Sequence, residues 1–140
     1  MAPTLNIIGA GKVGRVLGRL FAASGAFNVQ DVLTRSMDSA AEAVHFMGAG
    51  HAVDAIGQMG AADAWMLAVG DDQIEAACAQ LAGVPGLAGA VVFHCSGAKA
   101  SDVLAAAAQG GALTASLHPV RSFADPAHVA QHFGGTFCGI

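Results

Sequence analysis

The sequence predicts an α/β fold with a doubly wound, mainly parallel sheet of about six to seven strands and helices on both faces. Short apolar runs alternate along the chain with segments of helical periodicity. The helical segments are about ten residues long, which is typical of the crossovers that join parallel strands. A glycine-rich turn also joins the first strand to the first helix, as it does in sheets that bind nucleotides.

Each predicted element follows from its local pattern. Leu5, Ile7 and Ile8 form the first apolar run, and Val13, Val16, Leu17, Leu20 and Phe21 recur at helical spacing in the segment after the glycines. The predicted strands are residues 4–8, 29–34, 52–53, 64–69, 90–94, 113–117 and 136–140. The predicted helices are residues 12–23, 39–47, 73–81 and 100–108, and their alanine content allows close approach to the sheet.

Length, charge and cysteine content narrow the class of protein. The 140 residues suit one domain, and 54% apolar against 11% charged residues excludes a disordered chain. A net charge of −4 gives no basic surface for nucleic acid. The uncharged residues 76–98 contain glycine, proline and histidine, so they do not predict a membrane span, and no secretory signal is visible. Three unpaired cysteines fit reduced thiols, and we expect a cytoplasmic domain.

The stretch Ile8-Gly9-Ala10-Gly11-Lys12-Val13-Gly14 contains a complete Gly-x-Gly-x-x-Gly between the first strand and the first helix. Gly9 permits the tight turn, Gly11 lets backbone amides approach a pyrophosphate, and Gly14 lets helix and strand pack closely. The pyrophosphate would lie on the positive helix N-terminus. A purely structural glycine turn is the alternative, but the strand–turn–helix context favours a dinucleotide site that includes Ala10, Lys12 and Val13.

The end of the second strand indicates which dinucleotide is bound. An acidic residue there would accept hydrogen bonds from the ribose of NAD, but Asp31 lies in mid-strand and Thr34 occupies the discriminating position. Arg35 and Ser36 follow, and both suit the 2′-phosphate of NADP(H). The alternative is a solvated arginine beside a serine that caps the next helix.

The turn after the fourth strand, Val69-Gly70-Asp71-Asp72, should lie over the ribose and pyrophosphate of the cofactor. For the two aspartates we favour capping of the following helix over a part in catalysis.

Candidate catalytic residues follow the late strands. The chain has no tyrosine, which excludes the Tyr–Lys mechanism of short-chain reductases, and its lysines are better explained as solvated. His94-Cys95-Ser96-Gly97 and His118-Pro119 lie at carboxyl ends of strands, where ligands of parallel sheets bind. His118 could donate a proton or hold a carboxylate, with a purely structural strand-end histidine as the alternative, and Ser96 could bind nicotinamide or substrate. Cys95 has no base to activate it, and we expect no metal site.

These motifs, in this order, resemble the N-terminal domain of NADP oxidoreductases of the deazaflavin-dependent type (the DUF2520 group). Pyrroline-5-carboxylate reductases and 6-phosphogluconate dehydrogenase-like enzymes share the glycine and Thr-Arg-Ser motifs, and prephenate dehydrogenases share a His-Pro. The resemblance implies a Rossmann-like fold, hydride transfer, and a helical second domain that completes both the substrate pocket and a homodimer. The chain stops inside the apolar stretch after Phe133, so we expect residues 1–140 to be the first part of a longer protein.

The leading functional expectation is therefore an NADP(H)-binding domain of an oxidoreductase. Hydride would pass between nicotinamide and a small carbonyl, imine or deazaflavin acceptor, and the substrate is not indicated. The 140 residues alone are expected to be inactive in turnover. Two alternatives stay open, a non-catalytic NADP(H) sensor whose partner reads its occupancy and an enzyme similar to prephenate dehydrogenase.

Overall fold

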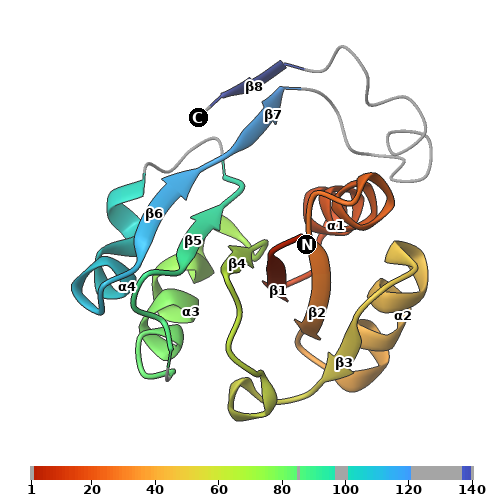
Figure 1. Ribbon diagram of the computed structural model, residues 1–140, viewed down its shortest axis with the longest axis horizontal. Coiled ribbons are helices and arrows are strands. Elements are labelled where there is room, and N and C mark those ends of the chain that lie inside the picture. Colours follow the sequence, from red (N-terminus) through yellow and green to blue (C-terminus); the bar gives the residue numbers. More distant parts are fainter. Residues whose placement is uncertain (1, 85, 97–100, 121–136, 140) are drawn as a thin grey trace.

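Six parallel strands form the central sheet in the order β3-β2-β1-β4-β5-β6. Figure 1 shows β1 in the middle of the sheet, with β2 and β3 on one side of it and β4, β5 and β6 on the other. This computed structural model describes residues 2–84, 86–96, 101–120 and 137–139, with the backbone alone for residues 101, 118–120 and 137–139. The strands of the sheet are β1 (Thr4–Ile8), β2 (Asn28–Leu33), β3 (His51–Val53), β4 (Ala64–Leu67), β5 (Val91–His94) and β6 (Leu113–Ser116). The predicted doubly wound sheet is confirmed.

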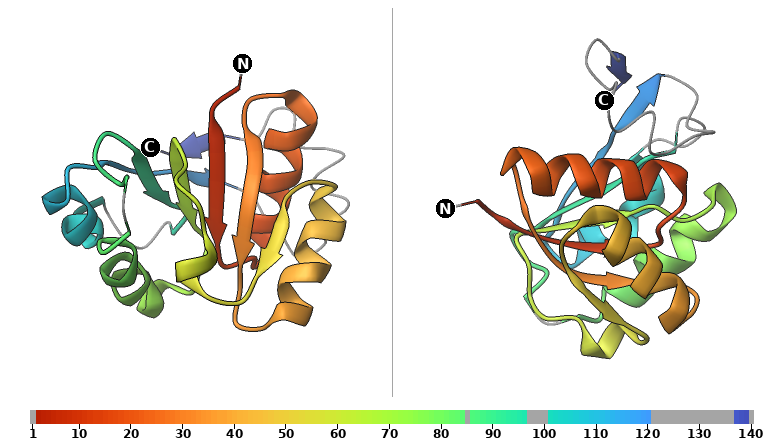
Figure 2. Two further views of the ribbon diagram at one scale, coloured as in Figure 1. Left: turned by 60° about the horizontal axis from the view of Figure 1, so that its bottom comes forward. Right: turned by 90° about the vertical axis from the view of Figure 1, so that its right-hand side faces the viewer.

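Helices cover both faces of the sheet, as predicted. They are α1 (Lys12–Ser24), α2 (Met37–Met47), α3 (Ile74–Leu81) and α4 (Ala105–Gln109). Figures 1 and 2 show α1 and α2 on one side and α3 and α4 on the other. Alternate residues of β4 supply the two cores, with Met66 in the cluster under α1 and α2 and Trp65 and Leu67 in the cluster under α3 and α4.

Several predicted elements differ from the structure, three of them in the second half of the chain. The segment 136–140 does not join the main sheet, because its strand β8 (Phe137–Gly139) pairs antiparallel with β7 (His118–Val120) in a separate ribbon. The predicted helix 100–108 is a 3₁₀ turn at Ser101–Leu104 followed by the short α4. The helix predicted from residue 73 begins at Ile74, after a 3₁₀ turn at Asp71–Gln73.

No helix in the described part of the chain is long and apolar enough to cross a membrane.

Asn6 in β1 is a fully buried polar residue that joins this strand to β2 and to the loop before β4. Its Oδ1 accepts from the Asp31 N–H and from Gln30 Nε2, both at 3.1 Å, and its Nδ2 donates to the Gly60 carbonyl at 2.8 Å. The register between β1 and β2 shifts at this point, because two residues of β1 from Leu5 match three of β2 from Val29. The bulge removes the Asp31 N–H from the hydrogen bonds between the two strands, and the Asn6 side chain accepts it instead.

We expect Asn6→Ala to lower the free energy of unfolding by about 2–4 kcal/mol, because the Asp31 N–H and the Gly60 carbonyl would lose their buried partner. Urea denaturation measures the loss. The exposed Asn28, whose Nδ2 donates to the Ala2 carbonyl at 3.4 Å, is the matched control, and Asn28→Ala should cost no more than about 0.5 kcal/mol. Equal losses in the two variants would contradict a special role for Asn6.

Candidate functional site

The candidate site lies at the carboxyl ends of β1 and β4, where the strand order reverses. Ligands of open parallel sheets bind in the crevice at such a switch point. Gly9 makes the turn that leaves β1, with a φ of +84°, and its N–H donates to the Leu33 carbonyl at 2.7 Å. A Cβ at Gly9 would lie 2.6 Å from the Ala68 carbonyl oxygen, so this turn requires glycine for its conformation and for its packing.

Gly14 and Gly11 have different surroundings. A Cβ on Gly14 would collide with the Cβ of Ala68, so glycine here lets α1 lie directly against the end of β4. A Cβ on Gly11 would meet only the Ala68 carbonyl oxygen at 3.8 Å, an ordinary contact. Gly11 faces two of the clefts described below, so the space beside it is open to a ligand.

The N-terminus of α1 opens onto these clefts, and among the described residues no side chain caps it. Gly11 is the N-cap and provides no side-chain hydrogen bond, and the first turn contains no acidic residue. The free amides and the helix dipole therefore favour an anion at this point. Lys12 is exposed at the first helical position.

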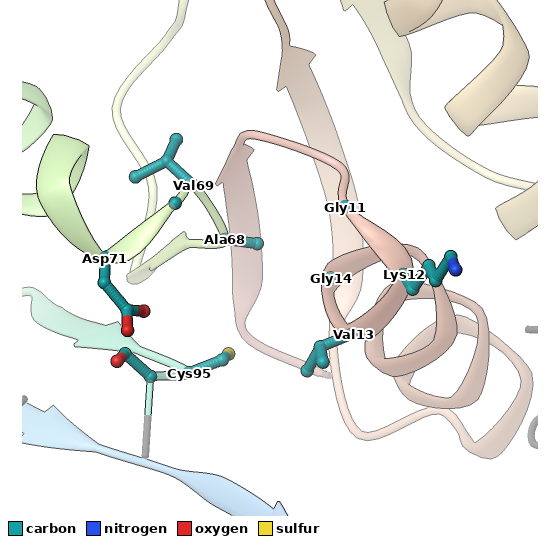
Figure 3. A pocket seen from close by; sticks show the side chains of 10 residues that line it. Gly11, Lys12, Val13, Gly14, Ala68, Val69, Asp71 and Cys95 are labelled. Carbon is teal, nitrogen blue, oxygen red and sulfur yellow. The ribbon is translucent and has the colours of Figure 1, made fainter. Parts of the chain in front are cut away.

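The first cleft, of about 260 Å³, runs from the glycine turn to the residues that follow β5. Figure 3 shows Val13 and Cys95 approaching it from opposite sides, while the Lys12 side chain points away. Of the predicted catalytic residues, Ser96 lines this cleft. The predicted cofactor-binding residues that line it come from the glycine turn and from the turn after β4, namely Gly11, Lys12, Val13, Gly14, Val69, Gly70 and Asp71.

The second cleft, of about 360 Å³, lies between the glycine turn and the end of β2. Four of the predicted cofactor-binding residues line it, namely Gly9, Ala10, Thr34 and Arg35. Ser36 does not line it. Its hydroxyl accepts from the Ser39 N–H at 3.1 Å as the N-cap of α2, so the capping alternative is correct for this residue.

A third cleft, of about 450 Å³, continues from Thr34 and Arg35 toward α3. Its walls are mainly apolar, with Leu33, Ile56 and Ala77 among them, and Asp54 and Gln80 contribute polar groups. Shared lining residues connect the three clefts, because Gly11 and Val69 belong to the first two and Thr34 and Val69 to the last two. The result is one groove across the carboxyl ends of β1, β2 and β4.

Asp31 and Asp71 differ in their surroundings. The Asp31 carboxylate accepts from the Gly60 N–H at 2.9 Å, which agrees with its predicted mid-strand position and separates it from the groove. Asp71 lies in the 3₁₀ turn at the first cleft, and neither this turn nor α3 has a side-chain cap. The prediction that Asp71 or Asp72 caps the following helix is therefore wrong.

The candidate catalytic residues are placed only in part. Ser96 lines the first cleft, and its backbone N–H donates to His94 Nδ1 at 3.1 Å. The His94 side chain is fully buried, so it does not face the ligand space that the sequence predicts at the end of its strand. His118 begins β7 opposite Gly139, but its side chain lies outside the described residues and its role stays a prediction. No group of three metal-ligating side chains occurs within the described ranges.

Sequence reasoning missed several residues that line the groove, among them Arg15, Ile56 and Gln73. For Arg15 a signal was present, because a helical side chain points toward the N-terminus and Arg15 follows Gly14 directly. Ile56 and Gln73 lie in short 3₁₀ turns, which leave no periodic pattern in a sequence.

Cys95 is half-buried beside the first cleft, and burial raises the pKa of its thiol to about 12. The thiol therefore stays protonated at neutral pH and forms part of the wall rather than a nucleophile.

We expect alkylation of Cys95 by iodoacetamide to rise about tenfold per pH unit from pH 8 to 10, because only about one thiol in ten thousand is ionised at pH 8. An ordinary thiol with a pKa of about 8.5 is about one-quarter ionised there and levels off by about pH 10. Peptide mass spectrometry measures the rate at Cys95 alone, with the same cysteine in the urea-unfolded protein as the control. A plateau for Cys95 below pH 10 would show that the thiolate forms readily.

Comparisons with known proteins agree with this architecture. Residues 3–119 match the family model described as a Rossmann-like domain, and the comparison with curated proteins gives no match. A Bacteroides fragilis protein described as an NADP oxidoreductase is similar over 87% of this chain and 45% of its own, with a TM-score of 0.72 and 17% identity. A Coxiella burnetii pyrroline-5-carboxylate reductase is similar over 88% and 46%, with a TM-score of 0.70 and 19% identity. A variant imine reductase from Myxococcus stipitatus in complex with NAD⁺ is similar over 88% and 43%, with a TM-score of 0.64 and 24% identity. At these identities the likeness shows the fold, and the chain spans less than half the length of each structure.

Proposed function

The chain belongs to the Rossmann-like domain family, and from this premise we propose that it is the NADP(H)-binding domain of an oxidoreductase. The observation that carries the proposal is the groove over the reversed strand order, with a glycine turn at its centre and Arg35 beside it. The structural neighbours are NAD(P)-dependent oxidoreductases, which supports the same class of reaction.

The residues of the groove fit a dinucleotide in each of its parts. The uncapped N-terminus of α1 and the open space at Gly11 suit a pyrophosphate. The apolar walls around Ile56 and Ala77 suit a flat aromatic base, and the first cleft extends toward Ser96, where the reacting ring would lie. When bound, the cofactor supplies or accepts a hydride. The protein binds and orients it through these groups and shields it with Val13 and Val69.

NADP(H) is preferred over NAD(H) because of the charges at the end of β2. Among the described residues none that lines the second cleft is acidic, and Arg35 presents an exposed guanidinium there. A guanidinium forms charge-assisted hydrogen bonds to a phosphate, whereas a ribose hydroxyl would require an acceptor.

The acceptor and the catalytic groups belong to the same proposal. Ser96 and His118 are the candidates to meet a small carbonyl, imine or deazaflavin acceptor. Because the chain spans less than half of its structural neighbours, we propose that a further helical domain completes the substrate pocket and a homodimer. The narrower resemblance to the deazaflavin-dependent group rests on Ser96-Gly97 and on the His118-Pro119 pair.

We expect Arg35→Ala to weaken NADPH binding by about ten- to a hundredfold and to leave NADH binding nearly unchanged. A charge-assisted hydrogen bond contributes roughly 1.5–3 kcal/mol, and about 1.4 kcal/mol corresponds to a tenfold change in affinity. Titration by cofactor fluorescence measures both constants on the same preparation. Equal losses for the two cofactors would show that Arg35 does not contact the 2′-phosphate.

We expect Gly11→Val to abolish binding of either cofactor while the fold persists, because its side chain would enter the pyrophosphate space and meet no protein atom closely. The loss of stability should stay within about 1 kcal/mol, the cost of a poorer N-cap. Gly14→Ala is the contrasting variant and should lose about 1–3 kcal/mol through its collision with Ala68. Circular dichroism and thermal unfolding monitor the fold. Retained binding in folded Gly11→Val would place the nucleotide elsewhere.

A further inference from the structure

Arg15 is oriented by contacts on two sides. It lies in α1 one residue after Gly14, and its Nε and Nη2 donate to the Ala10 carbonyl at 3.3 and 3.2 Å. Its guanidinium carbon lies 5.7 Å from the centre of the Phe46 ring on α2, within the range of a cation–π interaction. The half-buried side chain is therefore directed back toward the glycine turn and lines the second cleft.

The second cleft concentrates positive charge. Arg15 lines it from α1 and Arg35 from the loop after β2, and no aspartate or glutamate is found among the described residues of its lining. Within the described part of the chain neither arginine forms an ion pair. By contrast, Asp71 lines the first cleft and Asp54 the third. A guanidinium has five N–H donors, and the Ala10 carbonyl takes two from Arg15, so the others can bind an anion.

We propose that Arg15 is a second phosphate-binding residue, which holds the 2′-phosphate monoester of NADP(H) together with Arg35. The inference rests on the proposed function and extends it to the choice of cofactor. A phosphate monoester carries up to two negative charges and three acceptor oxygens, so it can engage two planar guanidinium groups at once. A ribose hydroxyl can satisfy neither arginine's charge, and the cleft then discriminates between the two cofactors by charge and by the number of donors.

Phe46 acts as a positioning residue in this arrangement. The Phe46 ring also forms a cation–π contact with Arg19, whose guanidinium carbon lies 5.2 Å from the ring centre. Arg19 is one helical turn beyond Arg15 and does not line the cleft. Arg15 and Arg19 thus both stack on the Phe46 ring of α2, and of the two only Arg15 lines the second cleft. Arg19 is therefore a matched control in residue type, helix and contact partner.

The test measures binding of NADPH, NADH, adenosine 2′,5′-bisphosphate and adenosine 5′-monophosphate by calorimetric titration. Arg15→Ala should weaken NADPH and the bisphosphate by about ten- to a hundredfold and change NADH and the monophosphate by less than about threefold. Arg19→Ala should leave all four constants within about threefold. Phe46→Leu should weaken NADPH by about two- to fivefold, because it removes the aromatic ring and retains the charge.

The outcomes separate this inference from the function on which it rests. Wild-type protein that binds none of the four ligands would overturn the proposed function. Wild-type protein that prefers NADPH, with Arg15→Ala indistinguishable from Arg19→Ala, would overturn the role of Arg15 alone. An equal loss of NADPH and NADH in Arg15→Ala would assign this residue to support of the Ala10 carbonyl instead. A variant lacking both Arg15 and Arg35 should bind NADPH no more tightly than NADH.

Discussion

The structure depends on the close approach of α1 to the end of β4. The chain leaves β1 at Gly9 with a positive φ and begins its helix at Lys12, and Gly14 then rests on Ala68 without an intervening Cβ. Any side chain at Gly9 or Gly14 would push the helix away from the sheet. This contact directs the N-terminus of α1 into the crevice between β1 and β4, so the packing of the fold and the anion-binding end of the helix have one origin.

A buried amide sets the register on the other side of the crevice. Without the bulge beside Asn6, Ile7 would pair with Asp31, and the carboxylate would share the apolar face that Ile7 occupies. The extra residue pairs Ile7 with Val32 instead and leaves Asp31 to accept from Gly60. Leu33 then ends β2 opposite Ile8, and the following Thr34 and Arg35 reach the cleft. The buried Asn6 thereby helps to set the position of Arg35 at the second cleft.

Most of the main sheet could be predicted, because its strands are short apolar runs separated by glycines and helices with a clear period. The roles of Gly9, Gly11 and Gly14 follow from a motif with one geometry. Ser36 could not be assigned, because the same hydroxyl can cap a helix or bind a phosphate, and only the 3.1 Å contact with Ser39 decides. The pairing of β7 with β8 depends on partners distant in sequence, which local patterns do not encode.

The charges of the groove act locally. A net charge of −4 opposes a polyanionic cofactor, yet charged residues make up only 11% of the chain, and two of its six basic residues line one cleft. At physiological ionic strength exposed charges are largely screened beyond about 8 Å. A phosphate in the second cleft would therefore interact with Arg15, Arg35 and the start of α1 far more strongly than with distant carboxylates. Half-burial of Arg15 reduces screening further, so a few placed cations can outweigh an acidic surface.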